Sequence, residues 1–142
     1  MAVVGDIDHL SAAISHATAP AFMLGAVAGF LSILIARMER IVDQNRSLRS
    51  GAFASLEPSV RQAIGDSFAR RMKLLGRAIY FAVLSALVTA ALLIGAFLAA
   101  LVGVAHGGVV AVMFVIALAL LMGSLADLAR EIRLHIATMG LG

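Results

Sequence analysis

The sequence contains no cysteine and no tryptophan, and only 13% of its 142 residues are charged. Without cysteine the chain cannot form a disulfide, a thiolate metal site or a thiol nucleophile. Hydrophobic residues make up 62% of the chain, and its mean hydropathy is +1.04. A soluble domain is roughly 45–50% apolar and about 25% charged. The excess of apolar residues therefore indicates a protein that folds in a lipid bilayer.

Several functional motifs are also missing. The sequence has no nucleophile elbow, zinc-binding helix motif or phosphate-binding loop, so we expect neither an enzyme nor a cofactor. Residues 17–36 and 78–126 carry no charge, whereas coupled transporters usually need an ionisable side chain within the membrane. Because no Lys or Arg precedes Arg37, a secretory signal peptide is not expected. The sequence pI is about 10.6, but the net charge is only +3 and basic residues flank the apolar segments, so nucleic-acid binding is not expected either.

The two uncharged stretches predict three transmembrane helices. Residues 17–36 have about the length that crosses ~30 Å of hydrocarbon, and residues 78–126 suit two spans that are separated near His106. The predicted fold class is an all-α integral membrane protein in which a cytoplasmic helical hairpin extends from the first and second spans. Along the chain we expect a periplasmic or interfacial lead-in helix (1–16), the first span (17–36), the basic cytoplasmic hairpin (37–77), the second span (78–104), a short periplasmic loop (105–108), the third span (109–126) and a cytoplasmic tail (127–142).

The basic residues predict how the chain is threaded. Nine of the eleven Lys and Arg residues lie between Arg37 and Arg77, and the other two are Arg130 and Arg133. Segments on the cytoplasmic side of a membrane carry the excess of Lys and Arg. We therefore expect a multi-pass protein of the bacterial inner membrane, with its N-terminus in the periplasm and its C-terminus in the cytoplasm.

Two apolar stripes predict the cytoplasmic hairpin. One continues from the first span with heptad spacing and consists of Leu34, Met38, Ile41, Asn45 and Leu48. The other follows Pro58, which suits the first turn of a helix, and consists of Val60, Ile64, Phe68, Met72 and Leu75. Packing of one stripe on the other would form the hairpin. At the end of the third helix, Asp127 and Arg130 are expected to pair across one turn.

Small residues recur at every fourth position in two spans. Gly25 and Gly29 form one such ridge, and the other contains Ala91, Gly95, Ala99 and Gly103. Ridges of this kind let helices approach closely in lipid. They are our candidates for helix packing and for assembly into a homo-oligomer or a membrane complex. The hydroxyls of the spans are expected to bond to helix carbonyls: Thr18, Ser32, Ser85, Thr89 and Ser124.

Two other groups of residues could form sites. The predicted outer side carries His9, His16 and His106, which are weak candidates for a metal site because imidazole binds transition metals, although interfacial histidine is common. Beside the first and second spans lie Arg37, Arg40, Asp43, Arg70 and Arg71. In an oligomer these residues could form a charged ring, or they could contact lipid headgroups. The simpler interpretation is that they set topology and solubility.

Short motifs in four places carry a family resemblance. They are Ala19-Pro20-Ala21-Phe22, Arg37-x-x-Arg40-Ile41-x-Asp43, Arg70-Arg71 through Ile79, and Arg130-Glu131-Ile132-Arg133-Leu134. Through them, residues 19–135 resemble an uncharacterised bacterial family known as domain of unknown function 2721. The family pattern often has Asn and Arg where this chain has Ala36 and Gln44. The resemblance implies a small inner-membrane protein with three spans and implies no activity.

Two functions remain open at this point. The first is a non-enzymatic structural protein that self-assembles or serves as an accessory subunit of a membrane complex. The alternative is a homo-oligomeric passive ion channel or pore. The copy number around an axis would distinguish them, because an open axis is needed for conduction.

Overall fold

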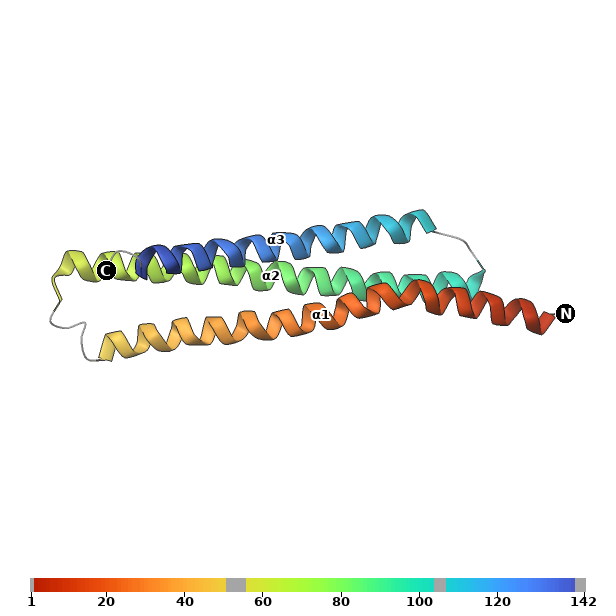
Figure 1. The fold of residues 1–142 in the computed structure, drawn as a ribbon, viewed down its shortest axis with the longest axis horizontal. Helices are drawn as coiled ribbons and strands as arrows, with labels where there is room; N and C mark the ends of the chain where they lie inside the picture. Colours follow the sequence, from red (N-terminus) through yellow and green to blue (C-terminus); the bar gives the residue numbers. More distant parts are fainter. Residues whose placement is uncertain (1, 51–55, 104–106, 140–142) are drawn as a thin grey trace. The chain divides into compact units, whose positions relative to one another are not determined.

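The computed structural model describes residues 2–50, 56–103 and 107–139, and side chains are described from residue 11 to 137, apart from those gaps and residues 12, 13, 16 and 48–50. In these residues every regular element is a helix: α1 (Ala2–Ser50), α2 (Pro58–Val102) and α3 (Gly107–Met139) (Figure 1). Each helix contains a stretch that is long and apolar enough to cross a membrane. The structure therefore confirms the predicted all-α fold class with three membrane-spanning helices.

The helix ends follow local chemistry. Helix α2 begins at Pro58, where a residue without an N–H group removes no helical hydrogen bond. It ends before Gly103, which has φ of +73° and donates its N–H to the Ala100 carbonyl at 3.3 Å. Glycine adopts this left-handed conformation without steric cost. Gly103 thus terminates the helix, one turn beyond the other members of its predicted ridge.

Helix α1 has no break at the predicted boundary between the lead-in helix and the first span. Pro20 lies inside it and is buried. Proline removes one backbone hydrogen bond from a helix interior, and membrane helices tolerate this loss because neighbouring groups can satisfy the freed carbonyl. The lead-in helix, the first span and the first half of the predicted hairpin are consequently one element.

The chain divides into two compact units, and each helix contributes to both. Unit 1 contains Met1–Phe30 and Ala82–Met122, and unit 2 contains Leu31–Phe81 and Gly123–Gly142. The two units differ in chemistry. Unit 1 contains no Lys or Arg and only two acidic residues, Asp6 and Asp8, whereas unit 2 contains all eleven Lys and Arg and the other six acidic residues.

Unit 1 packs around small and hydroxyl-bearing side chains. From α2, Ala82, Ser85, Thr89 and Leu92 are buried at alternating spacings of three and four residues, and Ala117 of α3 is buried as well. The Ser85 hydroxyl donates to the Ala117 carbonyl at 2.8 Å, and the Thr89 hydroxyl donates to the Ser85 carbonyl at 2.8 Å. Small residues and interhelical hydrogen bonds are what hold helices together in lipid.

In unit 2, a hydroxyl-to-carbonyl hydrogen bond likewise joins α2 and α3. The Ser124 hydroxyl donates to the Ala78 carbonyl at 2.6 Å, and both residues are fully buried. The Phe81 ring lies 3.8 Å from the position that a Cβ atom would take at Gly123, so a side chain there would meet the ring. These contacts confirm that Ser85, Thr89 and Ser124 bond to helix carbonyls, as the sequence predicted.

The two stripes of the predicted hairpin both lie in unit 2, and three of their members are inaccessible to solvent. Leu34, Ile41 and Leu75 are buried, and Met38 and Met72 are half-buried. This burial matches the predicted inward faces of α1 and α2. Direct packing of one stripe on the other stays a prediction.

Candidate functional site

The most unusual chemistry in the described residues is a pair of carboxylates inside unit 2. Ser124, Asp127 and Glu131 follow one another on α3 at spacings of three and four residues, which keeps them on one side of a helix. All three are buried, and the exposed fractions of Asp127 and Glu131 are 2% and 1%. Acidic side chains are almost never so fully buried unless they are paired.

Glu131 binds two arginines that come from two other helical segments. Its Oε2 atom accepts a hydrogen bond from Arg37 Nη1 of α1 at 2.7 Å. Its Oε1 atom accepts two from Arg71 of α2, at 3.0 Å from Nε and 2.8 Å from Nη2. One carboxylate therefore links all three helices within unit 2.

Asp127, one turn earlier on α3, binds a second pair of arginines. Arg77 of α2 places Nε 3.2 Å from Oδ2 and Nη2 3.5 Å from Oδ1, and Arg130 Nη1 lies 3.5 Å from Oδ1. The Asp127–Arg130 contact confirms the predicted pair across one turn. Although Oδ2 is close to Arg77 Nε, no aligned hydrogen bond reaches this buried atom in the described residues. Asp127 is thus held by charge more than by directed hydrogen bonds.

The cluster of Asp127, Glu131 and their four arginines has more positive than negative charge, and its positive groups are the more exposed. Two carboxylates face four guanidinium groups, so the cluster carries a formal excess of two positive charges. Arg71 is 13% exposed, whereas Arg37, Arg77 and Arg130 are 39%, 52% and 66% exposed. The negative charges therefore lie inside, and most of the positive charge lies at the surface. Breaking a buried pair by removing one partner typically costs about 3–5 kcal/mol, so the cluster is suited to fixing helix positions.

The predicted charged ring is only partly brought together. Arg37 and Arg71 meet at Glu131, whereas Arg40, Asp43 and Arg70 are exposed. Arg70 and Arg71 also line a shallow groove with Ala63, Asp66 and Ser67 of α2 and Leu134 of α3. Assembly of these residues into a ring between copies of the chain stays a prediction.

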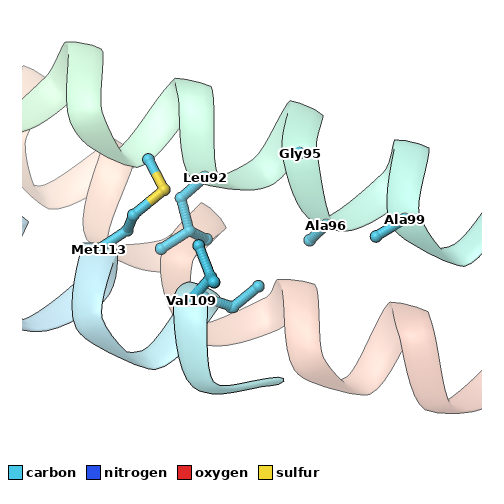
Figure 2. A pocket seen from close by; sticks show the side chains of 7 residues that line it. Leu92, Gly95, Ala96, Ala99, Val109 and Met113 are labelled. Carbon is cyan, nitrogen blue, oxygen red and sulfur yellow. The ribbon is translucent and has the colours of Figure 1, made fainter. Parts of the chain in front are cut away.

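The two small-residue ridges lie in different surroundings. Gly25 and Gly29 are exposed, and a Cβ atom added at either would meet no other atom within 4 Å. Ala91 is exposed too. Gly95 and Ala99 line an apolar groove of about 270 Å³, whose other lining residues are Leu92, Ala96, Val109, Val110 and Met113. Figure 2 shows that Leu92, Met113 and Val109 reach across one end, while Gly95, Ala96 and Ala99 leave space at the other.

The candidate metal ligands cannot be placed together. The side chains of His9 and His16, and the whole of His106, lie outside the described residues. Among the residues that were described, no group of three His, Cys, Asp or Glu side chains is arranged to hold a metal ion. Metal binding by the three histidines stays a prediction.

The role of Glu131 was not predicted from the sequence. The sequence predicted a cytoplasmic tail over residues 127–142 and a pair between Asp127 and Arg130, but no partner for Glu131. A signal was present, since Ser124, Asp127 and Glu131 repeat every three or four residues on one face. The basic segment upstream offered the partners Arg71 and Arg37, which precede Glu131 by 60 and 94 residues.

These observations define the class of protein. Three helices that are each long and apolar enough to cross a membrane make the chain a multi-pass α-helical membrane protein. A family model described as protein of unknown function (DUF2721) matches residues 17–141, so the chain belongs to that family, as its motifs suggested. No curated protein and no solved structure matches the chain.

Proposed function

We propose that this protein is a non-enzymatic structural or accessory component of a membrane assembly and that it associates with copies of itself through α1. The observation that carries the proposal is the open face of α1 at Gly25 and Gly29. A glycine pair four residues apart lets a second helix approach closely. Here no atom of the described chain occupies that face within 4 Å of an added Cβ.

The geometry of α1 shows why this face is free within one chain. Met23 and Val27 are the buried residues in this part of the helix, at 8% and 1% exposure. Gly25 is two residues from each of them, which is about 200° around the helix axis. The glycine ridge consequently points away from the side that packs inside unit 1, and it is available to a neighbouring molecule.

The polar groups support association rather than chemistry. Asp127 and Glu131 are bound by arginines, and the buried hydroxyls in the apolar helices are bonded to backbone carbonyls. These groups are used to hold helices, which is what a packing component requires. The protein's surface in the membrane is then left to small and apolar side chains.

The test is to fill the ridge. Gly25→Leu combined with Gly29→Leu should lower the copy number measured by native mass spectrometry in detergent and in nanodiscs, because two larger side chains hold the partner helix away. Interhelical contacts in lipid are worth roughly 0.6–2 kcal/mol each, so losing a close-packed ridge is enough to change an oligomer. Ala19→Leu is the matched control, since Ala19 is exposed on the same helix and lies about 120° around the helix axis from Gly25.

The same proteins distinguish the alternative function. Wild type and the ridge variant are placed in liposomes that contain an ion-sensitive dye. A structural component leaks no more than empty liposomes in either form. Leakage by wild type that disappears in the ridge variant would establish the passive pore instead, and an unchanged copy number in the ridge variant would remove α1 from the association.

A further inference from the structure

The exposed arginines around Asp127 carry more positive charge than the carboxylate neutralises. Arg77 and Arg130 both contact Asp127, so this part of unit 2 has a formal charge of +1. We propose that Arg77 and Arg130 bind the phosphate group of an anionic membrane phospholipid. The proposal is independent of self-association, since it concerns a surface of unit 2 and a lipid partner.

The position along the helices suits a headgroup. Arg77 is the last charged residue before the uncharged stretch 78–126, and Asp127 is the first after it. Both therefore lie where an apolar span gives way to polar chain, which is the depth of lipid phosphates. Tyr80 lies one turn further into the span and is 64% exposed, and exposed aromatics of this kind are enriched at the membrane interface.

The guanidinium groups keep donors for a second anion. Arginine has five N–H donors, and Arg77 directs Nε and Nη2 toward Asp127 while Arg130 directs only Nη1, at 3.5 Å. Their side chains remain 52% and 66% exposed. A phosphodiester presents two charged oxygens that guanidinium groups bind in pairs. Asp127 itself would repel the phosphate, but it is 2% exposed and lies behind the arginines.

Two neighbouring side chains of α2, Phe81 and Lys73, also favour anion binding at Arg77. The Arg77 guanidinium lies 5.9 Å from the centroid of the Phe81 ring, a distance at which a cation is attracted to an aromatic face. Lys73 is exposed one turn before Arg77 on the same side of α2, and it adds positive charge. In contrast, Arg37 and Arg71 direct their shortest hydrogen bonds, of 2.7–2.8 Å, to Glu131. The lipid contact is therefore placed at Arg77 and Arg130 rather than at the arginines that meet inside the unit.

The experiment is a lipid titration followed by native mass spectrometry in a neutral detergent. Phosphatidylglycerol and phosphatidylcholine with the same acyl chains are compared as ligands, and wild type should bind the anionic lipid more tightly. Arg130→Gln should weaken phosphatidylglycerol binding about fivefold, the effect of one basic residue near a membrane surface, and leave phosphatidylcholine binding unchanged. Arg77→Lys keeps a positive charge near Asp127 but loses the planar guanidinium group with its paired N–H donors. It should therefore also weaken the binding of phosphatidylglycerol.

Two controls make the result specific. Arg46→Gln removes an exposed arginine from unit 2 at the far end of α1 from its apolar span, and it should leave phosphatidylglycerol binding within twofold of wild type. Soluble glycerol 3-phosphate, added at the concentration of the lipid, should not displace it. Equal binding of both lipids, an unchanged Arg130→Gln protein, an equal loss in Arg46→Gln, or displacement by glycerol 3-phosphate would each overturn the proposal. Far-UV circular dichroism confirms that every variant is helical.

Discussion

Replacement of Glu131 is the sharpest test of how unit 2 is held together. Its side chain is 1% exposed and accepts three hydrogen bonds from Arg37 and Arg71. Glu131→Ala leaves both guanidinium groups without their carboxylate partner. Arg71 is only 13% exposed and cannot easily regain water, whereas Arg37 is 39% exposed and can turn toward solvent.

The loss of stability in Glu131→Ala can be estimated from the different exposure of Arg71 and Arg37. Removing one partner of a buried ion pair costs about 3–5 kcal/mol, and the exposed Arg37 recovers part of its hydration, so we expect about 3 kcal/mol. Glu131→Gln keeps one oxygen acceptor and the side-chain shape but loses the charge. A hydrogen bond to a charged group contributes about 1.5–3 kcal/mol, so this variant should lose about half as much stability as Glu131→Ala.

Hydrogen exchange measured by mass spectrometry in nanodiscs reports the loss of stability in each segment of the chain. Amide protection in the α3 part of unit 2 should fall by roughly 100-fold in Glu131→Ala, because every ~1.4 kcal/mol is a tenfold change in the opening equilibrium. Glu39→Ala is the matched control: Glu39 is exposed on α1 in the same unit, and surface changes stay within about 0.5 kcal/mol. Protection in Glu131→Ala that matches this control would refute the assigned role.

A paired replacement separates charge from packing. Arg71→Met alone should destabilise unit 2, since among the described residues it leaves Glu131 with Arg37 as its partner. Arg71→Met combined with Glu131→Leu should restore most of the lost protection, because replacing a buried ion pair with apolar side chains is often neutral or stabilising. An additive loss in the double variant would show that the two side chains do not interact.

Three further predictions test other levels of the structure. Ser124→Ala removes the 2.6 Å hydrogen bond to the neighbouring helix and should cost about 0.6 kcal/mol, and at most ~1.7 kcal/mol, by the same exchange measurement; no change in protection would show that the bond contributes nothing. Cysteines introduced at Ile41 and Met72 should form a disulfide under oxidation, which is easily read because the chain has no cysteine of its own, and failure to cross-link would count against the helical hairpin. A reporter inserted at Gly107 should be periplasmic and one fused to the C-terminus cytoplasmic, and a periplasmic C-terminal reporter would reverse the predicted threading.

The parts of the fold that depend on local chemistry could be predicted from the sequence. Uncharged stretches located the spans, Pro58 marked the start of α2 as found, and the i,i+3 spacing gave the contact between Asp127 and Arg130. Each of these depends on residues a few positions apart. Gly25 of the predicted ridge is exposed, and its role in helix packing stays a prediction.

What the sequence did not reveal depends on long-range register. Within a span nearly every residue is apolar, so the inward face has no contrast with the lipid-facing face, and periodicity cannot identify Ala82 or Ala117 as buried. The ion-pair site around Glu131 could not be predicted for the opposite reason. Glu131 looks like a solvated charge in its own helix, and only the alignment of α2 with α3 brings it within 3.0 Å of Arg71.

The order of synthesis gives the ion pairs of Glu131 a further consequence. Arg37 and Arg71 precede Glu131 by 94 and 60 residues. At a translation rate of about 5–20 residues per second, Arg37 waits roughly 5–20 s for its partner. During that time both arginines stay hydrated, and their positive charge is available to hold the growing chain in its orientation. Helix α3 then supplies the carboxylate that neutralises part of this charge, so a chain that stops before α3 would leave both arginines without their buried partner.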